Sequence, residues 1–140
     1  MDYAAESDMV NRFGNNEVVA LTDRSQTGAI DPNVLQQALD AASAQIDTYL
    51  SGRYALPLQI VPTYLVKLCC DIARYELCVG STRGTEEIET RYKDAVRFLE
   101  LAAAGKITLG VTAAGQVQST NTVEFNTGTQ IFSRRDRGAY

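Results

Sequence analysis

The sequence predicts a mainly α-helical fold: a compact bundle of about four helices, with a short strand-like segment and an extended C-terminal arm. In three stretches between residues 31 and 106, apolar side chains recur every three or four positions, which is the period of one helix face. Each stretch begins beside a residue typical of helix starts and ends beside glycine or proline. Residues 112–140 lack this period, so we divide the chain into a helical domain, residues 1–111, and an arm, residues 112–140.

Two small helices are expected before the first long one. Ser7 can cap a helix over residues 8–13, which Gly14 would end. Asn16 can cap a second turn over residues 17–21. Both elements are short because polar, turn-forming residues follow each of them at once.

The first long helix begins after Asp31, a good capping residue, with Pro32 at a position where a missing N–H costs little. Its apolar stripe contains Leu35, Ala38, Leu39, Ala42, Ile46, Tyr49 and Leu50. Pro57 and Pro62 then bracket an extended connector. We expect its apolar side chains to be covered: Tyr54, Leu56, Leu58, Ile60 and Val61.

Two further helices form a predicted hairpin. The first starts at Pro62, and Thr85 caps the second, which Gly105 ends. The first has an apolar face made of Leu65, Leu68, Cys69, Ile72, Tyr75 and Val79. The second has a stripe made of Ile88, Tyr92, Ala95, Val96, Leu99, Ala102 and Ala103. Residues 107–111 alternate in polarity and predict a brief strand or extended arm.

Composition and charge exclude several classes of protein. With 45% hydrophobic and 21% charged residues, the chain is typical of a globular domain, and no apolar run approaches 18 residues. The net charge of −4 divides into −3 for residues 1–30, −2 for residues 31–111 and +1 for the arm. A general nucleic-acid binder would concentrate a basic excess on one element, which is not seen. The N-terminus resembles no signal peptide, so we expect a protein made in the cytoplasm, without membrane insertion.

No catalytic or metal site is predicted, and we expect no cofactor and no enzymatic activity. Cys69, Cys70 and Cys78 lie in one predicted helix, and a bridge between the adjacent pair would be strained, so reduced core thiols in a reducing compartment are expected. The chain contains no histidine that would complete a zinc site. Glu86, Glu87 and Glu89 suit a first helical turn, where carboxylates complement the helix dipole. A cysteine redox enzyme is a weaker alternative.

The arm contains apolar side chains that are too few to form a core of their own and that we expect another protein surface to cover. Its 29 residues can span up to ~95 Å when extended. The arm contains two strand-like apolar segments, Val123 with Phe125 and Ile131 with Phe132. They indicate that the arm binds a partner. The alternative is a disordered terminus or a strand folded back on the parent domain. A basic cluster precedes the terminal Tyr140 and consists of Arg134, Arg135 and Arg137. It can dock on an acidic partner, contact DNA or only keep the C-terminus in solvent.

Two arginines of the body are candidate interface residues. Arg53 follows Gly52, and arginine is enriched in interface hot spots, although pairing with Asp47 or Asp71 is an equal alternative. Its neighbour Tyr54 is expected to pack beneath the connector. Arg74 is expected to form a local or intersubunit ion pair.

The order and spacing of several sequence blocks resemble the phage Mu-like head-to-tail adaptor family over residues 3–110. The blocks are IDTYL at 46–50, RYALPL at 53–58, DIARYEL at 71–77, RYKDA at 91–95 and GKI at 105–107. The resemblance implies a helical bundle that forms a ring, dodecameric by analogy, beneath the portal protein in the virion neck. It further implies that a stopper or tail-completion protein lies on the distal side and that genomic DNA passes through the lumen without sequence-specific binding.

We therefore expect a structural adaptor that joins capsid to tail through ring contacts and the arm. A small DNA-binding or packaging accessory protein, using the basic cluster and one helix, is the alternative. Steep salt dependence of duplex DNA binding would separate the two hypotheses.

Overall fold

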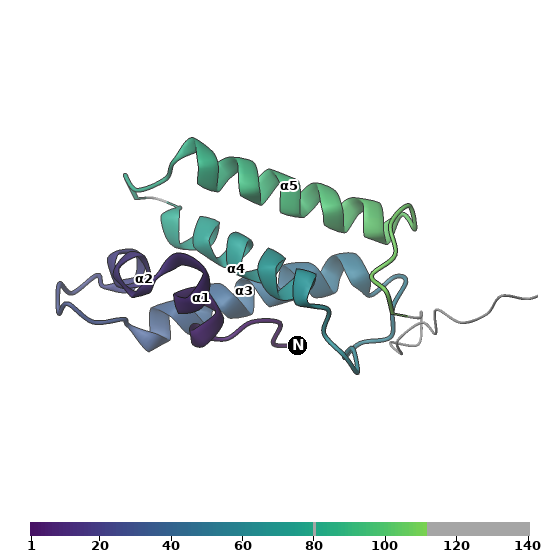
Figure 1. Cartoon of the computed structure of the whole chain (residues 1–140), viewed down its shortest axis with the longest axis horizontal. Coiled ribbons are helices and arrows are strands. Elements are labelled where there is room, and N and C mark those ends of the chain that lie inside the picture. Colours follow the sequence, from purple (N-terminus) through teal and green to yellow (C-terminus); the bar gives the residue numbers. More distant parts are fainter. Residues whose placement is uncertain (80, 112–140) are drawn as a thin grey trace, which may run out of the picture.

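A computed structural model describes residues 1–79 and 81–111, which form five helices. These are α1 (Glu6–Phe13), α2 (Asn15–Thr22), α3 (Pro32–Leu50), α4 (Thr63–Cys78) and α5 (Glu86–Ala103). The three long helices run lengthwise along the body, and α1 and α2 lie on the side away from α5 (Figure 1). The mainly α-helical fold is confirmed, with two short helices and three long ones rather than about four. The predicted arm, residues 112–140, lies outside the described residues.

Helix ends follow the expected capping chemistry at three positions. The Asp31 carboxylate accepts hydrogen bonds from the backbone N–H groups of Asn33 (2.9 Å) and Val34 (3.3 Å) at the start of α3. Thr85 caps α5 through its hydroxyl oxygen. Gly105 ends α5 in the left-handed region, with φ +73°, a conformation that glycine adopts without a side-chain penalty.

The two short helices begin earlier than predicted. Asp8, rather than Ser7, ties down the start of α1, because its carboxylate accepts a hydrogen bond from the backbone N–H of Ala5 (2.8 Å). The helix therefore includes Ser7. Similarly, α2 starts at Asn15, directly after Gly14, so Asn16 lies inside it.

The core lies around α4, which contacts each of the other four helices. The predicted stripes of α3 and α5 face it, and Leu35, Leu39, Ile46 and Leu99 are almost completely buried. Every residue of α4 from 68 to 74 is buried, because the other helices cover this middle stretch of α4 on all sides. At the α4–α5 contact, the rings of Tyr75 and Tyr92 stack with centroids 4.0 Å apart.

Three expectations about exposure are wrong. Val79 lies just beyond the end of α4 and is 64% exposed, and Ile60 in the connector is 52% exposed. Ala103, the last residue of α5, is also exposed. Residues 107–111 form no strand with any part of the chain that the structure describes; instead, the backbone N–H of Leu109 donates to the Tyr54 hydroxyl (3.4 Å). No described helix is long and apolar enough to cross a membrane.

Candidate interaction surfaces

Two partly buried ion pairs attach the short helices to α4. Arg12 of α1 donates three hydrogen bonds to Asp71: from Nε to Oδ1 (3.1 Å), and from Nη2 to Oδ1 (2.9 Å) and Oδ2 (3.0 Å). Arg74 donates from Nε to Oε1 of Glu17 in α2 (2.7 Å). The Phe13 ring lies near both guanidinium groups, with centroid distances of 5.4 and 4.5 Å. Cations close to an aromatic face add a modest attraction to each ion pair.

Arg74 therefore forms an ion pair within the chain, as one alternative predicted, but its partner is Glu17 of α2 and not a residue of its own helix. Glu17 lies 57 residues away in the sequence. An additional intersubunit role for Arg74 stays a prediction.

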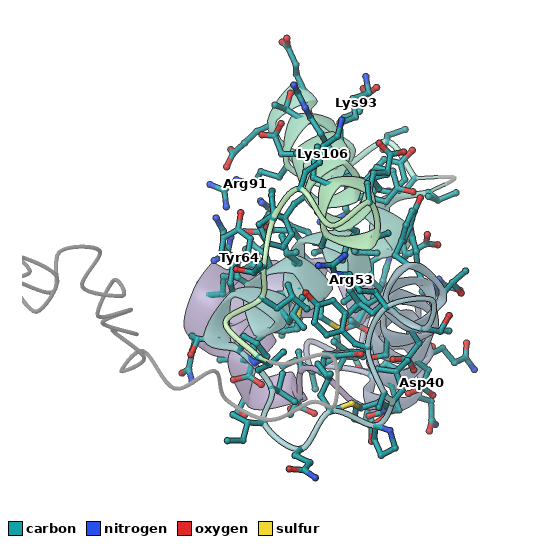
Figure 2. The ribbon with its side chains drawn as sticks, turned by 90° about the vertical axis from the view of Figure 1, so that its right-hand side faces the viewer. Asp40, Arg53, Tyr64, Arg91, Lys93 and Lys106 are labelled. Atoms are coloured by element: carbon teal, nitrogen blue, oxygen red, sulfur yellow. The ribbon has the colours of Figure 1, made fainter. Side chains whose placement is uncertain are left out.

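Arg53 does not pair with Asp47 or Asp71 in the described part of the chain. Asp71 holds Arg12, and Asp47 accepts a hydrogen bond from the Tyr3 hydroxyl (2.6 Å). The exposed Arg53 guanidinium instead lies against the backbone of Gly105, at the end of the body that faces the viewer in Figure 2. Tyr54 is buried beneath the connector, as expected. Arg53 remains a candidate contact residue.

The three cysteines are free and buried, which confirms their expected place in the core. Burial disfavours the charged thiolate and raises the pKa of Cys69 to about 11 and that of Cys70 to about 12. Burial also raises the pKa of Cys78. These shifts oppose the low thiol pKa that redox chemistry uses.

The first open surface among the described residues, here named the Tyr64 surface, comprises Tyr64, Lys67 and Arg91. Tyr64 is 45% exposed, its ring packs against Phe98 of α5 with a centroid distance of 4.6 Å, and Lys67 Nζ lies 5.1 Å from the Tyr64 ring centroid. Figure 2 shows Tyr64 and Arg91 on the same side of the body. A polar hollow of about 460 Å³ continues this surface, and it is lined by Arg12, Tyr64, Lys67, Leu68, Asp71, Arg91, Asp94 and Ala95.

The second surface, here named the Val79 cleft, lies where α4 ends and α5 begins. Its volume is about 540 Å³, and it is lined by Tyr75, Cys78, Val79, Gly84, Thr85, Glu86, Ile88 and Glu89. Val79 also borders a second hollow toward α2. An exposed valine beside a cleft leaves apolar area that a partner could cover.

The predicted arm contacts cannot be placed, because they lie outside the residues that the structure describes. They are Val123, Phe125, Ile131, Phe132, Arg134, Arg135, Arg137 and Tyr140. Sequence reasoning missed both the Tyr64 surface and the Val79 cleft. Tyr64 lies outside the predicted apolar face of α4, and this position could have indicated an exposed aromatic residue. Val79 continues the apolar face in the sequence and is exposed only because α4 ends at Cys78.

The described residues thus form a small helical body that includes the Tyr64 surface and the Val79 cleft, and comparison with known proteins assigns the chain to a phage family. The chain matches the family model described as Bacteriophage Mu, Gp36 over residues 3–127, and it belongs to that family. It is 36% identical over 141 residues to gene product J of Escherichia phage Mu, covering 99% of both chains. It is 35% identical over 133 residues to the Mu-like prophage FluMu protein gp36 of Haemophilus influenzae, covering 94% of this chain and 93% of the relative. The protein is therefore a Mu-like phage protein.

Proposed function

We propose that this chain is a structural, non-enzymatic head-to-tail adaptor of the virion neck. In this role it forms a closed ring, by analogy a dodecamer, beneath the portal and extends the DNA channel toward a stopper or tail-completion protein. Membership of a Mu-like phage family and the order of sequence blocks described above support the proposal.

The observation that carries the proposal is the presence of open apolar side chains at both ends of α4. Ile60 and Tyr64 lie at its start and Val79 at its end. The 16 residues of α4 separate these surfaces by roughly 24 Å. A subunit of a closed ring must contact its two neighbours through different surfaces, and an adaptor contacts further proteins above and below. Two separate open surfaces on a small body suit this arrangement.

The surface charges favour protein contacts over general DNA binding. The hollow beside the Tyr64 surface combines the cations of Arg12, Lys67 and Arg91 with the carboxylates of Asp71 and Asp94. DNA would meet repulsion as well as attraction there. A channel wall with mixed charge allows DNA to pass without being held.

Surface variants in the phage that encodes this chain test the proposal. Tyr64→Asp and Val79→Asp should each leave a folded protein but lower its incorporation into particles at least tenfold, because a charge would be buried at a contact. Gln37→Asp, on the exposed side of α3, is the matched control and should be incorporated normally. Normal particle assembly with both contact variants would contradict the use of these surfaces.

Removal of residues 112–140 tests the arm. We expect the truncated protein to remain soluble and helical but to be absent from particles, because the arm supplies attachment beyond the body contacts. Normal assembly of the truncated protein would refute that role. In the same experiments, duplex DNA binding that weakens steeply with salt would favour the packaging accessory instead.

A further inference from the structure

The Val79 cleft has an apolar floor and an acidic rim. Val79 is exposed within it, and Ile88 and Cys78 lie beneath. Glu86 and Glu89, from the first turn of α5, form the rim. A matching occupant therefore needs bulky apolar side chains followed closely by cations.

The rim carboxylates are not fully neutralised by ion pairs among the described residues. Glu89 pairs with Lys93 (2.7 Å), an exposed pair one helical turn away. The neighbouring Glu87 pairs with Arg91 (2.7 Å) and does not line the cleft. Glu86 makes no ion pair in the described part of the chain, so an incoming guanidinium would meet an available carboxylate.

One segment of the same sequence has the required pattern. Ile131 and Phe132 are followed, after a single serine, by Arg134 and Arg135, and Arg137 comes two positions later. No other segment of the chain places three cations within four residues. The apolar pair would suit the floor, and the arginines would suit the rim.

The arm is long enough for this segment to reach past its own body to the cleft of a neighbouring copy. Residue 111 follows the C-terminal end of α5, which lies at the opposite end of the body from the start of α5 (Figure 1). The cleft is lined by residues from the start of α5. The 18 residues of α5 span roughly 27 Å. Residues 112–130 number 19 and can extend up to ~63 Å, about twice the distance needed to return along the helix.

We propose that residues 131–137 of one copy occupy the Val79 cleft of a second copy of this chain. The inference deepens the proposed adaptor function by naming the partner of one open surface. Each copy then gives one segment and receives one, which is a heterologous contact that closes around a ring. Linking the segment to a subunit already in the ring raises its effective concentration at the cleft.

Photo-cross-linking in the full-length protein tests the source and the site together. Two forms of the gene are supplied equally in one infected cell. One encodes p-benzoylphenylalanine at position 132, and the other keeps Phe132 and carries Thr90→Ser as a mass marker beside the cleft. Thr90 is exposed on α5, and the change removes only one methyl group. A cross-link from position 132 to a peptide that contains the marker can form only between copies.

In assembled particles, we expect cross-links from position 132 to residues 75–89 and their adjoining peptides, with the Thr90→Ser marker in about half of them. Cross-links exclusively to unmarked cleft peptides would show that the segment returns to its own copy and would overturn the proposal. Cross-links to another virion protein, or none near the cleft, would also overturn it. If the cross-links overturn the cleft contact but the chain still lies beside the portal in those particles, the proposed adaptor function stands. If the chain is absent from the particles, the adaptor function is refuted.

Charge reversal provides an independent readout. Glu86→Lys combined with Glu89→Lys should lower the cross-link yield at least tenfold, and adding Arg134→Glu with Arg135→Glu should restore most of it. Glu87→Lys is the matched control, since Glu87 shares the same helical turn but does not line the cleft, and it should leave the yield within twofold. Equal yields in the reversed and control variants would contradict the proposed rim contact.

Discussion

Removal of the Arg12 side chain should destabilise the fold far more than removal of an ordinary surface arginine. Arg12 donates three hydrogen bonds to Asp71, whose side chain is only 3% exposed. In Arg12→Ala, that carboxylate would stay buried without its cation. The two short helices would also lose one of their attachments to α4.

The magnitude follows from the exposure of the two partners. Breaking a buried ion pair by removing one member costs roughly 3–5 kcal/mol. The Arg12 side chain is 25% exposed, so in Arg12→Ala water can partly solvate the Asp71 carboxylate in its place. We therefore expect the unfolding free energy to fall by about 2–3 kcal/mol. Arg74→Ala should cost less, about 1–2 kcal/mol, because its partner Glu17 is 34% exposed and stays partly solvated.

Urea unfolding followed by circular dichroism measures these losses. A double-mutant cycle then separates the ion pair from the packing of the side chains. Arg12→Met and Asp71→Leu should each destabilise the protein, whereas the double variant should recover most of the stability because no unpaired charge remains buried. The reasoning fails if Arg12→Ala costs less than about 0.5 kcal/mol, or if the double variant loses the sum of both single changes.

Two further predictions concern the thiols and the end of α5. Between about pH 9 and pH 11, the unfolded chain loses thiol protons that folded Cys69 and Cys70 retain, so unfolding free energy should fall by up to ~1.4 kcal/mol per pH unit for each thiol. Unfolding titrations of Cys69→Ala with Cys70→Ala should show a shallower slope, and an unchanged slope would exclude the thiols as its cause. Gly105→Ala should cost about 1–2 kcal/mol, because alanine is strained at φ +73° and its methyl group would meet the Arg53 guanidinium. The control Gly52→Ala, with open space and no positive φ, should stay within a few tenths of a kcal/mol by thermal unfolding, and equal effects would contradict the account.

The periodicity of apolar residues predicted the long helices well because each has at least one face directed to a shared core. The capping residues Asp31 and Thr85 placed the starts of α3 and α5, since their local hydrogen bonds need no distant partner. The same logic misplaced the start of α1, because the cap position is Ala5 and the carboxylate of Asp8, in the first turn, accepts the hydrogen bond from its backbone N–H. Alanine at a cap position gives no sequence signal of its own.

Burial within α4 was only partly predictable. Asp71 and Arg74 interrupt its apolar pattern and would ordinarily be placed in solvent, yet both are buried. Their partners, Arg12 and Glu17, lie 59 and 57 residues away. Nothing local in the sequence reveals such pairs, because they exist only after α1 and α2 pack against α4.

The candidate surfaces were the least predictable part of the body. Val79 continues the apolar face of α4 in sequence, but the helix ends at Cys78 and leaves the next side chain uncovered. Ile60 is similarly exposed by the path of its connector. Which apolar side chains remain open is decided by the last steps of tertiary packing, which periodicity does not describe.

The position of this chain in purified particles tests the adaptor account most directly. A reconstruction of the particle neck, together with protein identification from the same preparation, should place the five-helix body in one closed ring between the portal and the next neck protein. Particles that are complete and infectious without this chain, or that carry it away from the head-to-tail junction, would contradict the account.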